Sequence, residues 1–148
     1  MSKFRKILVI LLVIGSAAIA YATFGPEKIS PEFREVPVEK AQTEELNSFA
    51  EKLFTLAHRS TPREFGRYCF NVNDPYLSLF YRELKGYDRQ GWNVTKYSRI
   101  AGQPDSCQLH IINGKQENAI MTCCRGKDKT WKFLNFTTEN TDFSEFNN

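Results

Sequence analysis

Four cysteines and two histidines are the residues of this chain that could carry covalent or metal chemistry, and they are Cys69, Cys107, Cys123, Cys124, His58 and His110. The cysteines form no C-x-x-C pair and follow no zinc-ligand spacing, so the sequence predicts no metal site and no cofactor. An even number of cysteines is typical of structural disulfides where the compartment is oxidising. The chemistry expected of these thiols therefore depends on where the chain resides.

Nucleophilic catalysis by a cysteine would need a histidine beside it. His110 stands three residues after Cys107, and residues an odd number apart on a strand point to opposite faces. The chain also lacks a G-x-S-x-G elbow, a phosphate-binding glycine loop and an H-E-x-x-H motif. We therefore predict no catalytic residue and expect that the protein is not an enzyme. His58, at the end of a predicted helix, and His110, within a predicted strand, are expected to be structural.

Residues 1–24 have the layout of a secretory signal peptide. Three basic residues precede an apolar run, and alternating alanines near its end offer A-x-A cleavage sites. A signal anchor is the alternative, because residues 7–24 carry no charge and are just long enough to cross a bilayer. Both interpretations place residues 25–148 in the periplasm or outside the cell. If the leader is uncleaved, residues 7–24 would anchor the chain in the inner membrane.

The charge of the exported part excludes one class of partner. The chain has 20 basic and 17 acidic residues, and three of the basic residues lie in the leader. The remainder is formally neutral and lacks the basic surface of a nucleic-acid-binding protein. We therefore expect a protein partner and no nucleic acid, with the membrane contacted only through an uncleaved N-terminal segment.

Patterning divides the rest of the chain into three parts. Residues 25–41 contain three prolines and mixed charges, which predicts a linker. Residues 42–138 are long enough for one globular domain, and residues 139–148 form a polar tail.

The first half of this domain has helical periodicity. A helix from Thr43 to about His58 is predicted by an apolar stripe at helical spacing, formed by Leu46, Phe49, Ala50, Leu53 and Ala57. The segment Thr61-Pro62-Arg63-Glu64 is a capping box that should begin a short second helix. A third helix should begin near Asp74 and end at Gly86.

After Gly91 the period changes to two, which predicts strands over residues 92–100, 107–112, 118–124 and 130–138. The fold class is therefore α+β, with N-terminal helices packed on one face of a four-stranded antiparallel sheet.

The hydrophobic pattern sets the register of the second hairpin, since a one-residue slip would exchange its two faces. Pairing Ile111 with Ala119, Leu109 with Met121 and Cys107 with Cys123 makes one face wholly apolar. Extension to the last strand pairs Cys123 with Trp131 and Met121 with Phe133. Cys107 and Cys123 then become the expected disulfide. Cys69 with Cys124 is the remaining pair, and a swapped Cys69–Cys123 pair stays open.

The predicted helices are followed by strands, the last of which contain Ala119-Ile120-Met121 and Thr130-Trp131-Lys132-Phe133. In this arrangement the chain resembles small exported NTF2-like and cystatin-like domains. The resemblance covers roughly residues 42–138. It implies a curved sheet covered by helices, as in anchored periplasmic assembly domains of secretion channels and in small binding proteins. These domains share no catalytic set, so the resemblance transfers no functional residue.

Aromatic residues make up 14% of the chain, and the stretch from position 76 to 92 holds more large rings than one helix face can bury. Its rings are the predicted partner or ligand contacts: Tyr76, Phe80, Tyr81, Tyr87 and Trp92. The function that we expect is an exported, non-enzymatic binding or assembly module of the cell envelope. Two alternatives are a secreted or periplasmic inhibitor or immunity-type protein and a small enzyme on an NTF2-like cone.

Overall fold

The computed structural model describes residues 35–36, 38–100 and 105–146. The expected leader and most of the expected linker lie outside the described residues. Within the ranges that are described, no helix has the length and apolar character needed to cross a membrane.

Helices α3 (Lys40–Arg59), α4 (Pro62–Phe65) and α5 (Leu77–Gly86) form in the first half of the domain. Four of the five stripe residues of α3 are buried as predicted, Phe54 is buried in addition, and Phe49 is only half-buried. Helix α3 begins three residues earlier than expected, because Thr43 donates its hydroxyl to the Lys40 carbonyl (2.7 Å) rather than capping the first turn.

The predicted capping box before α4 is confirmed. The backbone N–H of Glu64 donates to the Thr61 hydroxyl (3.3 Å), and the Glu64 carboxylate accepts from the Thr61 N–H (3.0 Å). The short 3-10 helix η3 (Gly66–Tyr68) follows directly and leads the chain towards the sheet.

The sheet is an antiparallel meander in the order β1-β2-β3-β4-β5. Its strands are β1 (Glu35–Val36), β2 (Asn93–Ile100), β3 (Ser106–Ile112), β4 (Asn118–Arg125) and β5 (Trp131–Thr138). The four predicted strands are confirmed as β2 to β5. Strand β1 was not predicted, because its two residues lie in the proline-containing segment expected to be a linker.

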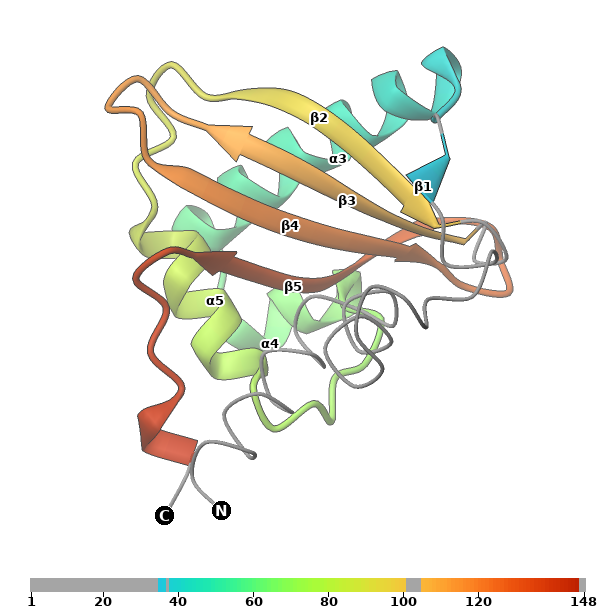
Figure 1. Cartoon of the computed structure of the whole chain (residues 1–148). Coiled ribbons are helices and arrows are strands. Elements are labelled where there is room, and N and C mark those ends of the chain that lie inside the picture. Colours follow the sequence, from blue (N-terminus) through green and yellow to red (C-terminus); the bar gives the residue numbers. More distant parts are fainter. Residues whose placement is uncertain (1–34, 37, 101–104, 147–148) are drawn as a thin grey trace, which may run out of the picture.

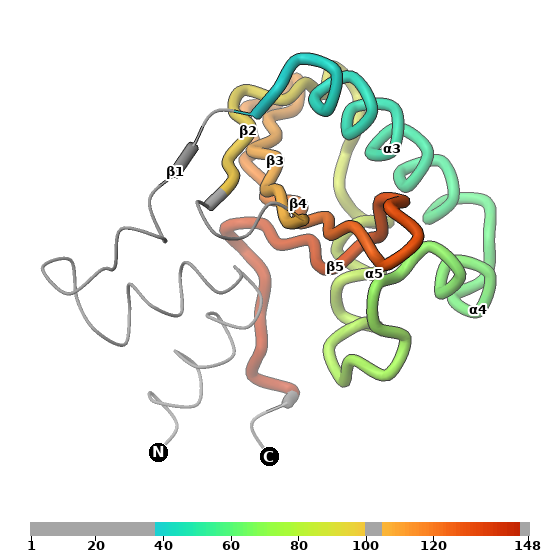
Figure 2. The backbone as a smooth tube through the Cα atoms, turned by 90° about the vertical axis from the view of Figure 1, so that its right-hand side faces the viewer, coloured from blue at the N-terminus to red at the C-terminus, as the bar shows by residue number. Residues whose placement is uncertain are grey.

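The helices pack on one side of this sheet, as Figures 1 and 2 show from two directions. Aromatic rings fill the space between the two layers, and Phe54 of α3 contacts the rings of Tyr87, Trp92 and Phe136. The α+β class with helices on one sheet face is therefore what the chain adopts.

The register predicted between β3 and β4 is confirmed at every pair, including Cys107 opposite Cys123. The register predicted between β4 and β5 is wrong, because Cys123 pairs with Phe133 and Arg125 with Trp131. The turn between these strands lies one residue later than expected, over residues 126–130, where the N–H of Gly126 donates to the Thr130 carbonyl (3.3 Å). An irregularity after Thr122 then shifts the register once more.

The C-terminal residues include one apolar anchor. Phe143 packs against the core and contacts the rings of Tyr76 and Phe80. The 3-10 helix η4 (Ser144–Phe146) follows, and Glu145 forms an ion pair with Arg82 of α5 (2.6 Å). The expected polar tail therefore also carries one half-buried ring that packs against the core.

Candidate binding groove

The four cysteines of the described residues are all free thiols, and no two lie at disulfide distance. Three of them occupy one row across the sheet, in which Cys69 lies beside Phe133, Phe133 beside Cys123, and Cys123 beside Cys107. Strand β5 therefore separates Cys69 from Cys123 by two strand spacings, about 9–10 Å, which is beyond the reach of a disulfide. The swapped pairing of Cys69 with Cys123 is thus wrong for this fold.

Cys124 lies next to Cys123 on β4, so its side chain points to the opposite face of the sheet from the row. The expected Cys69–Cys124 pair is therefore also absent. Cys107 and Cys123 are cross-strand neighbours as predicted, but their thiols are not joined in this structure, so the disulfide expected between them stays a prediction.

Burial makes these thiols poor nucleophiles. Desolvation raises the pKa of Cys69 to about 12 and the pKa of Cys107 to about 11, and it raises the pKa of Cys123 well above its ordinary value. The reactive and metal-binding form of cysteine is the thiolate, which these environments disfavour. Among the described residues, no group of three histidine, cysteine or acidic side chains could hold a metal ion.

The predicted aromatic contact region is divided by the fold. Phe80, Tyr81 and Tyr87 are buried in the core. The Tyr81 hydroxyl donates to the carbonyls of Ala57 (3.2 Å) and Ser60 (2.9 Å), so its polar end is used internally. The Tyr87 hydroxyl likewise donates to the Glu117 carbonyl (2.7 Å). These three rings offer a partner almost no surface.

The other two predicted contacts, Tyr76 and Trp92, are half-buried, and they contact different residues. Tyr76 contacts Phe80 and Phe143, whereas the Trp92 indole N–H donates to the Glu51 carboxylate of α3 (2.9 Å). The structure therefore does not bring the five predicted rings together on one surface.

His110 is half-buried on the sheet face turned away from the helices, where its Nε2 lies 3.2 Å from the Ser98 hydroxyl. A cavity of about 440 Å³ lies along this face, bordered by His110, Thr95, Ile120 and Thr137. Ser98 is buried and does not border that cavity, so the pair is not arranged as an accessible nucleophile with its base. His58 is exposed in the last turn of α3, where a cation would favour the helix dipole.

An open groove of about 940 Å³ lies between the N-terminal half of α3 and the turn that joins β4 to β5. We call it the Trp131 groove, and we define it by Glu44, Glu45, Phe49, Lys52, Tyr68, Trp131 and Lys132. Helix α3 supplies the first four residues, of which Glu45, Phe49 and Lys52 lie on one face because they are four, three and seven positions apart. The remaining three come from η3 and the first two positions of β5.

Three aromatic rings of this groove are half-buried: Phe49, Tyr68 and Trp131. All three pack against the core, and each keeps part of its surface in the groove. The Trp131 indole N–H donates to the Glu45 carboxylate (3.3 Å), and the Lys52 ammonium lies 4.4 Å from the centre of the Tyr68 ring. Each wall thus touches the other through a ring and a charged side chain.

The groove residues were not among the sequence-predicted contacts. Trp131 appeared only in the predicted strand register and in the family resemblance, Lys132 only in the latter, and the α3 residues lie about 80 positions away from them in the sequence. Phe49 belonged to the predicted apolar stripe of α3, but nothing in the stripe distinguishes the ring at its edge from those at its centre.

No protein-family model, curated protein or solved structure matches this chain. The resemblance to NTF2-like and cystatin-like domains therefore stays a prediction. The geometry of the Trp131 groove is the feature of the molecule that points most directly to a function.

Proposed function

We propose that the chain is an exported, non-enzymatic binding module that holds a peptide segment of a partner protein in the Trp131 groove. The leader pattern of residues 1–24 supports export. The lack of an accessible thiolate or nucleophile–base pair among the described residues supports binding rather than catalysis.

One observation carries the proposal, and it is the partial exposure of three rings along a single open groove. Large rings that are buried on one edge and open on the other supply contact area without further loss of conformational freedom, since the core already fixes them. Aromatic side chains flanked by polar and charged groups are the usual composition of protein-binding surfaces. An extended segment of a partner fits such a groove better than a globular surface does.

The charge of the groove suits a protein rather than a nucleic acid. Its walls carry both Glu44 and Glu45 and the ammonium groups of Lys52 and Lys132, so no basic surface is available to follow a phosphate backbone. The predicted membrane segment lies outside the described residues.

The test is site-specific photocrosslinking in cells that express the full chain. A photoreactive side chain at Ser48, which is exposed and borders the groove, should form one discrete adduct. The matched control is the same group at Lys85, which is exposed on α5 away from the groove. The crosslinked protein is then purified and titrated against the full chain and its Trp131→Ala variant.

We expect Trp131→Ala to weaken the affinity for the purified partner at least tenfold, because an aromatic anchor is worth more than about 1.4 kcal/mol in a typical interface. Equal adducts from both positions, or an affinity that Trp131→Ala leaves unchanged, would exclude the groove as the binding site.

A further inference from the structure

We propose that the Trp131 groove selects an extended peptide in which a basic and an acidic side chain stand three residues apart, with an apolar residue between them. This inference rests on the proposed function, and it specifies the chemistry of the segment that the groove would bind.

The spacing follows from the helical wall of the groove. Glu45 and Lys52 are seven residues apart on α3, which places them on one face of the helix about 10.5 Å apart along its axis. An extended peptide in the polyproline II conformation has three residues per turn and advances about 3.1 Å per residue, so side chains three residues apart share one face and cover roughly that distance. A basic side chain can therefore lie at Glu45 while an acidic side chain of the same peptide lies at Lys52.

The apolar position between the charges is set by Phe49. It stands four residues after Glu45 and three residues before Lys52, so its ring lies between them on the same face of α3. The ring is half-buried and lines the groove, which leaves apolar surface at the midpoint of the two charges. An aliphatic or proline side chain of the peptide would cover that surface.

The other charged groups of the groove reinforce this polarity. Glu44 is exposed beside Glu45 at the first end. At the second end, half-buried Lys132 donates to the Arg67 carbonyl (3.4 Å), next to the Tyr68 ring that Lys52 covers. The groove therefore has an acidic end and a basic end, which a peptide of opposite polarity complements.

Two further charges lie on the turn of the hairpin. The Asp128 carboxylate accepts from the N–H (3.1 Å) and the hydroxyl (2.9 Å) of Thr130, so it closes the turn. Lys129 is exposed at the rim with a left-handed backbone (φ 63°). Solvent therefore screens its charge more than it screens the charge of the half-buried Lys132. Both groups border the groove at the hairpin turn, but the Asp128 carboxylate is engaged by Thr130 and Lys129 is exposed, so the polarity of the groove rests on Glu45 and Lys52.

The experiment uses blocked synthetic peptides and the full chain. The proposed ligand is Lys-Pro-Leu-Glu between glycines, and the comparison peptides are Lys-Pro-Leu-Lys, Glu-Pro-Leu-Glu and a version with adjacent charges, Lys-Glu-Pro-Leu. The chain has only two tryptophans. The indole N–H resonance of Trp131 therefore reports on the groove, and that of Trp92, which bonds Glu51 of the same helix, serves as an internal control.

We expect the Trp131 resonance to shift saturably with the proposed peptide, at an affinity at least threefold better than for each comparison peptide, while the Trp92 resonance stays in place. Glu45→Gln keeps an acceptor for the indole N–H and removes the charge. It should weaken binding of the proposed peptide about two- to fivefold, as expected for a partly exposed ion pair, and should abolish the preference over Glu-Pro-Leu-Glu. Glu51→Gln is the matched control and should change nothing.

Equal affinities for all four peptides, or a Glu45→Gln variant with the same preference as the native chain, would overturn this inference. That outcome leaves the proposed function intact if the crosslinked partner still requires Trp131. Failure of the partner to depend on Trp131 would instead remove the proposed function itself, so the two results are distinguishable.

Discussion

Asn113, in the β3–β4 turn, and Asn135, on β5, are both buried, and they differ completely in how the hydrogen-bonding groups of their side-chain amides are satisfied. Asn113 is 2% exposed, and both ends of its side chain are hydrogen-bonded. Asn135 is 1% exposed, and neither its Oδ1 nor its Nδ2 has a partner among the described residues. Its cross-strand neighbour Thr122 is equally buried, and its hydroxyl is equally unpartnered within the described part of the chain.

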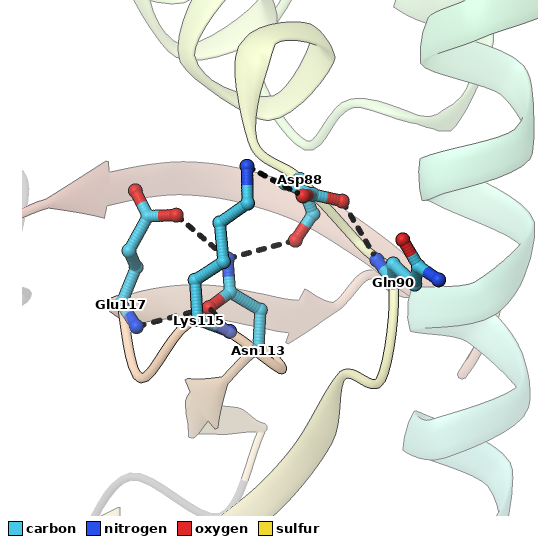
Figure 3. Close-up of polar contacts among 5 residues, drawn as sticks. All are labelled: Asp88, Gln90, Asn113, Lys115 and Glu117. Atoms are coloured by element: carbon cyan, nitrogen blue, oxygen red, sulfur yellow. Dashed lines mark hydrogen bonds and ion pairs between the residues drawn. The ribbon is translucent and has the colours of Figure 1, made fainter.

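The first asparagine organises a corner of the fold that Figure 3 shows in close-up. The Asn113 amide nitrogen donates to the Asp88 carbonyl (2.9 Å) and to the Glu117 carboxylate (3.2 Å). Its oxygen accepts from the N–H groups of Lys115 (3.0 Å) and Glu117 (2.9 Å). The corner therefore joins the β3–β4 turn to the loop that leads from α5 into β2.

The difference between the two sites teaches that burying a polar side chain can either stabilise or destabilise the fold. A buried polar group that is fully bonded stabilises the fold and specifies its geometry, whereas an unbonded one keeps only its cost of desolvation. We therefore expect substitutions at the Asn113 corner and at the outer pair, Thr122 and Asn135, to change stability in opposite directions.

The largest effect is expected at Asn113. Asn113→Ala removes four hydrogen bonds and leaves the Asp88 carbonyl and two turn N–H groups without their partner. We expect a loss of about 2–4 kcal/mol in the free energy of unfolding, since each buried group left unsatisfied costs about 1–3 kcal/mol and water recovers part of this. Urea denaturation of the full chain measures it. A loss below about 1 kcal/mol would show that the corner does not stabilise the fold.

A close backbone contact at the same corner provides the next test. A Cβ on Gly114 would lie 3.0 Å from the Gln90 carbonyl oxygen, which accepts the Gly114 N–H (2.9 Å). Gly114→Ala should therefore destabilise the fold by about 1–2 kcal/mol, because the turn at Gly114 and the loop at Gln90 must move apart to make room for the methyl group. Gly86→Ala is the matched control. A Cβ at Gly86 meets nothing within 4 Å, and alanine favours the helix, so that variant should be neutral or more stable by up to about 1 kcal/mol.

These two positions also show which parts of the fold the sequence predicts. The helices, four strands and the β3–β4 register follow from hydrophobic period alone, because one face of each element must be buried. The Asn113 corner was not predicted, since its partners at Asp88 and Gln90 come from a loop about 25 residues earlier in the chain. Local pattern carries no information on which loop a turn will contact.

The candidate site was less predictable than the fold for the same reason. Phe80, Tyr81 and Tyr87 are more than one helix face can bury, which predicts exposed contact rings, but the sheet and α3 bury them as well. The Trp131 groove arises where α3 meets a hairpin turn some 80 residues later in the chain. Its existence depends on the β4–β5 register, which the tight turn at Gly126 displaced from the predicted one.

The outer pair should respond in the opposite direction to the corner. Thr122→Val keeps the side-chain shape and replaces a buried hydroxyl that has no partner among the described residues with a methyl group. We expect the free energy of unfolding to rise by about 0.5–1 kcal/mol, since the cost of desolvating the hydroxyl is removed. Calorimetric melting temperatures of the two proteins measure the change. A less stable variant would mean that the hydroxyl is bonded in solution, and the comparison with Asn113 would fail.

The smallest effect is expected from the exposed charges that flank the Asn113 corner, and it is a dependence on pH. The Gln90 N–H (3.0 Å) and the Lys115 ammonium (3.1 Å) hold the pKa of Asp88 below its ordinary value of 3.8. Because the folded pKa is the lower one, this carboxylate stabilises the fold above the ordinary pKa, and the contribution is lost as the pH falls through the folded pKa.

Asp88→Asn should therefore lower the urea midpoint slightly at pH 7, while the two midpoints converge as the pH falls below about 4. Salt should reduce the difference at pH 7, because Lys115 is exposed. Asn113→Ala has no titrating group at the substituted position, and its deficit should persist into acid. If the stability deficit of Asp88→Asn is the same at pH 7 and in acid, the stability that the corner contributes comes from its neutral hydrogen bonds alone. The contrast with the outer pair would then rest on amide and hydroxyl groups only, with no contribution from charge.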